Sequence, residues 1–258
     1  MRAASRASSR RSLPTEGMSM TTPTRPRLAL LLGAGGLGLF ALVVAAMAAT
    51  VPAAFSQGVD DAWRALVGAS DVADVQGPLP MFFQHFGEGP GFLVHLVLVP
   101  VALLVVRRWR SALFWLAVMM GANILVSQVV KHLVDRERPA ADEAAGLYGP
   151  LFHTDHGSFP SGHSVTMGAF VVAVAALLPL AYRRWWWGVA ALLSVGMIWQ
   201  RTLVNAHWLT DTVAGVLGGA AFAALVWWAF ARLLDRDRGR PVRRRAADAT
   251  VAPQEVTA

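Results

Sequence analysis

The sequence predicts an all-α integral membrane protein, a bundle of six transmembrane helices, from its composition and from the spacing of its apolar runs. Of the 258 residues, 55% are hydrophobic and 15% are charged, and the mean hydropathy is +0.46. Soluble domains carry about 25% charged residues, and six long apolar helices would leave a soluble protein too little polar surface. A membrane-spanning helix needs about 20 apolar residues. The uncharged runs are Leu28–Val51, Gly89–Val106, Ser111–Val130, Gly162–Tyr182, Trp185–Gln200 and Thr212–Ala231.

Four of the six runs reach the length of a span outright. The first, third, fourth and sixth hold 24, 20, 21 and 20 residues, and the second holds 18. The fifth holds 16, so we expect its helix to extend through Val204 with Arg201 in the last turn. A cleaved signal peptide is the alternative for the first run, but its apolar core exceeds the usual length of about 7–15 residues.

The two ends of the chain differ from the apolar middle. Residues 1–27 are rich in Arg, Ser, Thr and Pro, and residues 235–258 are basic and then rich in Ala and Thr. Such polar segments cannot bury enough apolar surface to fold. We therefore expect a disordered basic tail over 1–27, a membrane domain over 28–234 and a second disordered tail over 235–258.

The distribution of charge predicts the orientation of the bundle. Six spans place both termini on one side, and if that side is the cytoplasm, the inner segments hold 18 of the 23 Lys and Arg residues. The outer segments then hold 11 of the 16 Asp and Glu residues. Because positive charge marks the cytoplasmic side, we expect a multi-pass protein of the cell membrane with both termini in the cytoplasm. The net charge of +7 then reports orientation, and nucleic acid is not an expected partner.

Polar residues gather at the predicted outer membrane boundary. They lie in three segments, KHLVDRERP (131–139), PSGH (160–163) and QRTLVNAHWLTD (200–211), which the six-span topology places on the same side. Polar groups at the membrane are costly and mark functional sites. The three segments therefore predict an extracytoplasmic active site.

Three cations of these segments indicate an anion with several oxygens. Lys131 and Arg138 are seven residues apart, two turns along one helix face, and Pro139 predicts that Arg138 ends that helix. Arg201 adds a third cation, and guanidinium forks suit phosphate oxygens. The alternatives are side chains that extend to the membrane interface, or a Lys131–Asp135 pair.

The PSGH segment predicts a helix start. Ser161 suits the N-cap position, with Gly162 and His163 in the first turn. The free N–H groups there would face the same anion, and Gly162 would let the backbone approach it closely. An ordinary cap before a span is the alternative.

His207 and Asp211 are four residues apart, one turn on one helix face. A carboxylate at that spacing can hold one imidazole tautomer, which leaves the other ring nitrogen free to attack phosphorus. His163 could then protonate the departing oxygen and afterwards activate water.

Metal binding is the rival chemistry for these residues. His207, Asp211 and His163 could form a metal site, but three nearby cations argue against a bound dication. His153 and His156 flank Asp155 in the outer loop and form a second candidate metal site; loop residues near the cavity mouth are the favoured interpretation. The chain has no Cys, which excludes thiolate ligands and a thiol nucleophile.

Together these motifs resemble the type-2 phosphatidic acid phosphatase superfamily. That family carries Lys, six residues and Arg-Pro; then Pro-Ser-Gly-His; then Ser-Arg, five residues, His, three residues and Asp. The chain matches with Lys131…Arg138-Pro139, Pro160–His163 and Arg201…His207…Asp211. It departs from the family at Gln200, in place of Ser or Thr, and over residues 202–205, which lack the usual Gly.

The resemblance implies a role for each residue. Lys131, Arg138 and Arg201 would clamp the phosphate, with further contacts from Ser161 and Gly162. His207 would be the nucleophile, Asp211 its orienting partner and His163 the acid, with no metal and no cofactor. The partners implied are the lipid bilayer and a membrane lipid phosphate: phosphatidate, phosphatidylglycerophosphate or polyprenyl pyrophosphate.

The implied activity is hydrolysis through a phosphohistidine intermediate. Three alternatives remain open. A lipid phosphotransferase would use the same site with an alcohol as acceptor. A related soluble group holds vanadate in a similar site for halide oxidation, and six spans argue against it. A membrane transporter finds only generic support, from small residues such as Gly215 and Gly219.

Overall fold

A computed structural model describes residues 26–154 and 156–238, and the regular structure of these residues is helical apart from one isolated bridge between Asp142 and Leu147. This confirms the all-α prediction. The elements, in chain order, are α1 (Arg27–Thr50), α2 (Gln57–Val67), η1 (Val72–Val75), α3 (Pro78–Phe86), α4 (Gly89–Leu93), η2 (Val94–Leu98), α5 (Val99–Val105), α6 (Trp109–Gly121), η3 (Ala122–Gln128), α7 (Val129–Leu133), α8 (Gly162–Leu177), α9 (Leu180–Leu203) and α10 (Leu209–Arg238).

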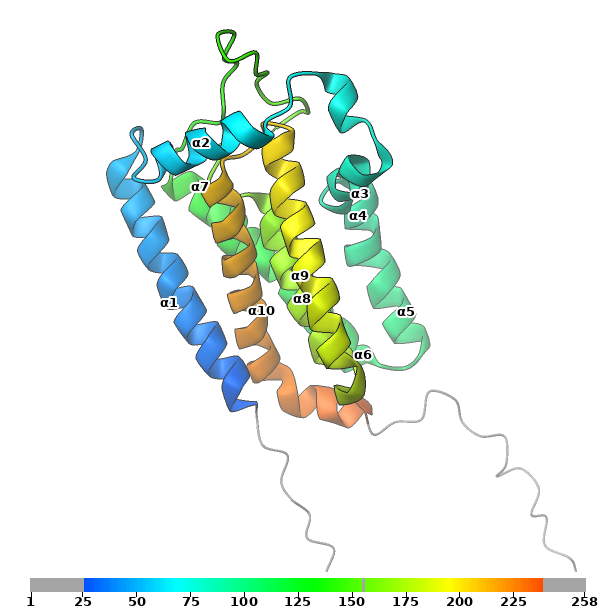
Figure 1. Cartoon of the computed structure of the whole chain (residues 1–258). Helices are drawn as coiled ribbons and strands as arrows, with labels where there is room; N and C mark the ends of the chain where they lie inside the picture. Colours follow the sequence, from blue (N-terminus) through cyan, green and yellow to red (C-terminus); the bar gives the residue numbers. More distant parts are fainter. Residues whose placement is uncertain (1–25, 155, 239–258) are drawn as a thin grey trace, which may run out of the picture.

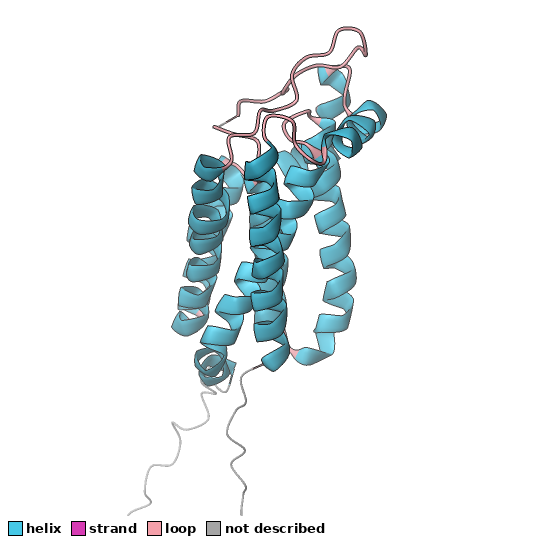
Figure 2. Cartoon of the chain, turned by 90° about the vertical axis from the view of Figure 1, so that its left-hand side faces the viewer, coloured by secondary structure: helices cyan, strands magenta, loops and turns pink. Residues whose placement is uncertain are grey.

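The predicted apolar runs correspond to long helical segments that stand side by side, with α2 lying across one end (Figures 1 and 2). In two of them the helix passes through a π-helical stretch, η2 between α4 and α5 and η3 between α6 and α7. Three segments, α1, α6–α7 and α10, are long and apolar enough to cross a membrane. A fourth span results if α3 and α4–α5, bent by 51°, are counted as one. The count of six spans therefore stays a prediction.

The fourth predicted run, Gly162–Tyr182, is interrupted by a proline. Pro179 has no N–H and disfavours helical geometry in the residue before it. Accordingly α8 ends at Leu177, Leu178 is extended, and α9 begins at Leu180. Tyr182 belongs to α9, together with the basic residues that follow it.

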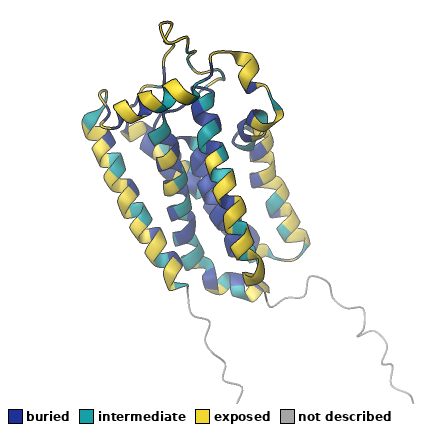
Figure 3. Ribbon diagram, in the orientation of Figure 1, coloured by how far each residue is buried: buried dark blue, intermediate teal, exposed yellow. Residues whose placement is uncertain are grey.

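The centre of the bundle is α8, which is buried along most of its length (Figure 3). Its backbone lies against that of α10: a Cβ on Gly168 would lie 2.1 Å from the Val216 carbonyl oxygen, and one on Gly219 would lie 2.1 Å from that of Val165. Small residues permit this approach in membrane helices. On the outside, α1 and α5 expose large apolar side chains such as Leu42 and Val105, as expected for lipid-facing surfaces.

The two ends of the bundle are formed by different elements. The start of α1, the α5–α6 and α8–α9 turns and the end of α10 lie at one end, and α2 with the loops before α8 and α10 lies at the other (Figure 1).

The helix α10 runs to Arg238, past the domain boundary predicted at residue 234. It continues because buried Asp237 accepts hydrogen bonds from Ser111 N (2.9 Å) and Arg110 Nη1 (3.0 Å). The tails predicted beyond it and before α1 lie outside the described residues, apart from these helix ends.

Candidate active site

The three predicted polar segments meet at the end of the bundle that carries α2, around a cavity of about 500 Å³. Five of the eight predicted site residues line it, and Lys131, Ser161 and Asp211 are buried outside its lining. The five are Arg138, Gly162, His163, Arg201 and His207. Thus predicted site residues up to 69 positions apart in the sequence contribute to one lining.

The ring of His207 is held in one tautomer by the backbone. Its Nδ1 lies 2.8 Å from the Ser158 carbonyl oxygen. Because a carbonyl only accepts, Nδ1 carries the hydrogen and donates it, which leaves the lone pair on Nε2. Arg138 Nη1 donates to Nε2 over 3.1 Å, so the free ring nitrogen faces a phosphate-binding type of side chain.

Asp211 does not make the direct bond to His207 that the spacing predicts. Its Oδ2 lies 3.8 Å from Nδ1. The carboxylate instead accepts from Ser158 Oγ (2.5 Å), Trp208 N (2.9 Å) and Arg136 Nη1 (2.6 Å). The reason is that His207 precedes α10, so the regular one-turn spacing does not apply to it. Asp211 positions the ring through Ser158, whose carbonyl binds Nδ1.

The helix that carries Lys131 ends earlier than predicted, so Lys131 and Arg138 do not share a helix face. The helix α7 stops at Leu133, and Val134 is extended. Side chains of an extended segment alternate between two sides. Val134 and Arg136 are buried while Asp135 is 85% exposed and pairs outward with His156 at 3.6 Å.

Arg136 is one of two residues that sequence reasoning missed. Its side chain is 2% exposed, and it bridges two fully buried carboxylates, Asp60 Oδ2 and Asp211 Oδ1, each at 2.6 Å. It also donates to Thr210 Oγ1 at 2.9 Å. The alternation of charge in DRERP was the available signal, since it indicates an extended segment with Arg136 and Arg138 on the same side.

Lys131 and Arg138 are both tied to the loop before α8. Lys131 Nζ donates to the carbonyl oxygens of Gly157 (3.0 Å) and His156 (3.3 Å). Arg138 donates through Nη2 to Gly157 O (2.7 Å) and through Nη1 to Ala206 O (2.6 Å). The two cations therefore meet at Gly157, although α7 ends between them.

The start of α8 confirms the predicted cap. Ser161 is the N-cap, and its Oγ accepts from Ser164 N at 3.4 Å. Gly162 opens the helix and lines the cavity. His163 follows in the first turn, and its Nε2 lies 3.1 Å from the Gln84 carbonyl oxygen.

Arg201 lies in the last turn of α9, as predicted, and it meets a second residue that sequence reasoning missed. Its Nη1 donates to Gln84 Oε1 over 2.7 Å. Gln200, the departure from the family pattern, donates to the same oxygen over 3.1 Å and does not line the cavity. No local pattern predicts a contact between α3 and α9 that joins residues more than 100 positions apart.

A family model matches the part of the chain that carries the candidate site. The model for the PAP2 superfamily matches residues 112–235, from α6 to the last turns of α10, and this stretch holds all eight predicted site residues. Over these residues, which are just under half of the chain, the protein matches the PAP2 superfamily. The resemblance seen in the motifs is thereby confirmed.

Several named proteins are similar to this chain. Lipid A 1-phosphatase of Rhizobium johnstonii is 37% identical over 128 residues, which are 48% of this chain and 49% of that protein. The chain thus spans about half the length of that relative. Phosphatidylglycerophosphatase B of Bacillus subtilis is 26% identical over 56% of this chain and 68% of that protein. The Escherichia coli protein YbjG, whose name assigns it provisionally to the undecaprenyl-diphosphatases, is 27% identical over 54% of this chain and 71% of that protein.

A solved structure shares the fold. The crystal structure of a transmembrane PAP2 type phosphatidylglycerolphosphate phosphatase from Bacillus subtilis matches 83% of this chain and 100% of that chain, with a TM-score of 0.58 and 21% identity. The apolar helices of the chain, in a fold shared with a transmembrane protein, indicate a membrane protein. Among the residues that the structure describes, no group of three or more His, Asp or Glu side chains is arranged to hold a metal ion.

The surroundings of His207 favour its neutral form. Burial is the largest cause that lowers its pKa well below 6.5, and the positive charges of Arg138, Lys131 and Arg201 lower it further. Imidazolium is disfavoured both by the loss of water and by the neighbouring cations. The lone pair on Nε2 therefore persists below neutral pH.

A pH profile checks this arrangement. We expect Arg138→Gln to move the acid limb of kcat/KM to higher pH, because removing a cation raises the pKa of His207 and so protonates it earlier. The same substrate in both proteins cancels the ionisation of the phosphate. Arg232→Gln, which removes an exposed cation near the far end of α10, serves as control. An acid limb that stays in place or moves to lower pH would contradict the prediction.

The ring of His163 packs against Gly87 and fills the space that a side chain at position 87 would need. A Cβ on Gly87 would lie 2.3 Å from His163 Cδ2 and 2.8 Å from Nε2. We expect Gly87→Ala to displace the ring and lower kcat about 100-fold, since misplacing a reacting group by about 1 Å has that cost. Gly35→Ala, with no atom within 4 Å of the new methyl group, is the matched control and should leave kcat unchanged. Equal rates for both variants would show that the position of His163 does not matter.

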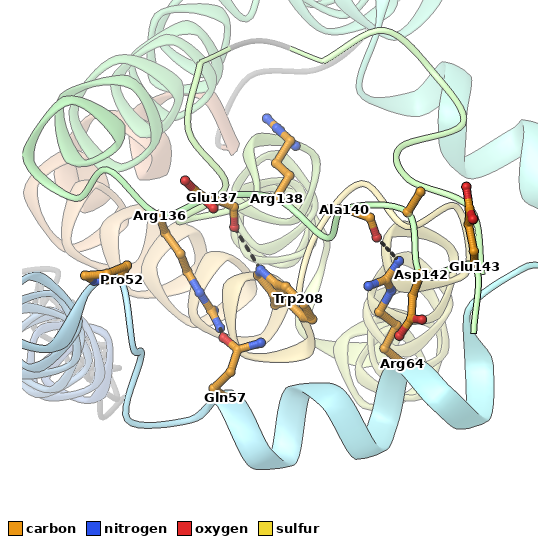
Figure 4. A pocket seen from close by; sticks show the side chains of 11 residues that line it. Pro52, Gln57, Arg64, Arg136, Glu137, Arg138, Ala140, Asp142, Glu143 and Trp208 are labelled. Atoms are coloured by element: carbon orange, nitrogen blue, oxygen red, sulfur yellow. Dashed lines mark hydrogen bonds between the residues drawn. The ribbon is translucent and has the colours of Figure 1, made fainter. Parts of the chain in front are cut away.

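A second cavity, of about 450 Å³, adjoins the first one at Arg138 (Figure 4). Arg138 lines both cavities. In the second one Trp208 lies between Arg64 and Arg136, whose guanidinium carbons are 5.7 and 5.4 Å from its ring centroid. Its indole N–H donates to the Glu137 carbonyl oxygen over 2.9 Å. These contacts hold the loop that carries His207.

Proposed function

We propose that this PAP2 protein is an integral-membrane phosphatase that hydrolyses a phosphomonoester or pyrophosphate of a membrane lipid through a phosphohistidine intermediate. The observation that carries the proposal is the imidazole of His207. Its Nδ1 is bound to a carbonyl and its Nε2 is directed at Arg138, in the same cavity as Arg201 and His163. The three named relatives, which are a lipid A phosphatase, a phosphatidylglycerophosphatase and a provisional diphosphatase, support the class of substrate.

In the first step the cations hold the phosphoryl oxygens and His207 attacks. Arg138, Arg201 and Lys131 neutralise charge as the phosphoryl group transfers, with Ser161 and Gly162 at the start of α8. A bond forms between Nε2 and phosphorus while the bond from phosphorus to the leaving oxygen breaks. His163 gives its proton to that oxygen, and the lipid alcohol or lipid monophosphate departs.

In the second step water replaces the histidine. His163, now neutral, takes a proton from water, and the hydroxide oxygen attacks phosphorus as the bond to Nε2 breaks. Phosphate leaves, and both histidines return to their starting forms. The Ser158–Asp211–Arg136 hydrogen bonds keep the ring of His207 in place through both steps.

We also propose the six-span topology, with both termini in the cytoplasm and the site on the extracytoplasmic side. Its support is the separation of charge along the bundle. The basic segments occupy the end opposite to the cavity, and positive charge favours the cytoplasm. Labelling of single Cys residues introduced at Ser70 and Arg232, which are both exposed, by a membrane-impermeant reagent tests this. Only the cysteine at position 70 should react in intact cells.

One assay tests the activity. Purified protein is given phosphatidate, phosphatidylglycerophosphate and a polyprenyl pyrophosphate, and phosphate release is measured. We expect release from at least one lipid, inhibition by vanadate as a mimic of pentacoordinate phosphorus, and indifference to EDTA. Absence of release from all of them would overturn the phosphatase proposal. Strict metal dependence would overturn the mechanism, and transfer of the phosphate to an added alcohol in preference to water would indicate a phosphotransferase.

A further inference from the structure

Glu88 places a negative charge in the wall of the catalytic cavity. Among the described residues that line this cavity, it is the one carboxylate, and the other ionisable side chains are arginines and histidines. A site that binds an anion gains nothing from a carboxylate beside the phosphate. Glu88 therefore calls for an explanation in terms of another part of the substrate.

The position of Glu88 is held by Gln84. The Gln84 side chain is 1% exposed, and its Oε1 accepts from Arg201 Nη1 (2.7 Å) and Gln200 Nε2 (3.1 Å). With its oxygen occupied by two donors, the amide presents Nε2 to Glu88 Oε1 and donates a hydrogen bond to it. The backbone is held as well, because the Glu88 carbonyl accepts from Phe92 N (2.8 Å) at the bend between α3 and α4.

The same segment places Glu88 on the side of the leaving group. Gln84 O lies 3.1 Å from His163 Nε2, and the neighbouring Gly87 packs against the His163 ring. In the proposed mechanism, His163 protonates the oxygen that departs from phosphorus. Because Nε2 donates to the Gln84 carbonyl, Nδ1 carries the proton that is transferred, and the leaving group that receives it lies in the one cavity that His163 and Glu88 both line.

We propose that Glu88, held by Gln84, selects lipid phosphomonoesters whose leaving group carries hydroxyl or amine donors, as a glycerol or amino-sugar headgroup does, over lipid diphosphates. The inference rests on the proposed function and names the substrate class for it. A neutral or cationic donor next to the leaving oxygen can bind the carboxylate. A diphosphate would place its second phosphate there, and two like charges in a partly desolvated site repel each other.

The test is a ratio of rates within one enzyme preparation. The ratio compares kcat/KM for phosphatidylglycerophosphate, whose leaving group is a glycerol, with kcat/KM for a prenyl diphosphate. A ratio cancels differences in the folded fraction between variants. We expect the wild type to prefer the monoester, and Glu88→Gln to lower the ratio by about tenfold or more, since the variant loses the repulsion.

Two further variants complete the design. Glu88→Asp keeps the charge and should keep the preference for the monoester even if both rates fall. Glu143→Gln removes a carboxylate from the exposed outer loop and should leave the ratio unchanged. A ratio that Glu88→Gln does not change, or a wild type that prefers the diphosphate, would overturn the inference while leaving the phosphatase proposal intact.

A measurement on the wild type covers the case in which the Glu88 variants fail to fold. Methylphosphonate and methylenediphosphonate are compared as inhibitors. Three cations alone would bind the more highly charged diphosphonate more tightly, whereas Glu88 should remove that advantage. Tighter inhibition by the diphosphonate, by tenfold or more, would overturn the inference. Absence of phosphate release from every lipid would instead overturn the phosphatase proposal, and this inference with it.

Discussion

Replacing His207 with Ala is expected to lower phosphate release by at least about a thousandfold while the protein remains folded in the membrane. The loss follows from the chemistry of the ring, since Nε2 is the atom that would bond to phosphorus and no neighbouring group replaces it. The residual rate would come from Lys131, Arg138 and Arg201, because these cations still position the phosphate and favour attack by water. The measurement is phosphate release by purified protein in detergent micelles.

A control and a trapping experiment make this result specific. His132→Ala removes an exposed imidazole from α7, near the site in the chain but outside the cavity lining, and should keep the normal rate. Wild-type protein mixed with a lipid labelled in its terminal phosphate and quenched at high pH should carry an acid-labile label. The His207→Ala protein should carry none. A normal rate for that variant, or label retained on it, would show that the nucleophile is another group.

Replacing Arg136 with Ala is expected to destabilise the protein by about 3–5 kcal/mol, the usual cost of removing one partner from a buried ion pair. The variant leaves Asp60 and Asp211 buried without their shared cation. Both carboxylates belong to the contacts that hold the loop of His207, so activity should fall together with stability. The measurement is the midpoint of thermal unfolding in detergent, followed by tryptophan fluorescence.

A double variant separates the electrostatic cause from a loss of packing. Adding Asp60→Asn to Arg136→Ala removes one of the two uncompensated charges, so it should restore part of the midpoint. On its own Asp60→Asn should lower it. Arg232→Ala, an exposed position on α10, is the control; it should change the free energy of unfolding by no more than about 0.5 kcal/mol and so leave the midpoint nearly unchanged. If the double variant unfolds earlier than Arg136→Ala, the buried charges are not what makes Arg136 necessary.

The sequence predicts the helices and caps of this protein that depend on residues close together in the chain. Apolar runs locate the helices, and the residue types of PSGH predict the cap at Ser161. Pro179 is the signal in the sequence for the break between α8 and α9. Helix ends are less predictable. The chain leaves α7 at Leu133 because extended geometry brings Arg136 between two carboxylates, and that gain depends on residues about 75 positions away in each direction along the chain.

Motifs do not predict the contacts between segments that are distant in the sequence. Asp60 in α2 binds Thr210 at the entrance to α10, and Gln84 in α3 binds Arg201 in α9. Each of these residues is ordinary in its local sequence. Their importance arises only when packing removes water from them, because a buried polar group must then find a partner. The family pattern lists the residues that would touch phosphate, and the structure adds those that hold them.

The short length of α8 has a consequence for where a substrate can react. Its 16 residues rise about 24 Å, whereas the hydrocarbon layer is about 30 Å thick. If the Pro179 end of α8 lies at the inner boundary of that layer, Ser161 lies about 6 Å beneath the outer one. A lipid could then deliver its phosphate without rising out of the leaflet, by sinking slightly toward the middle. A water-soluble phosphoester would have to pass through the headgroup layer to reach that depth, so depth itself would exclude it.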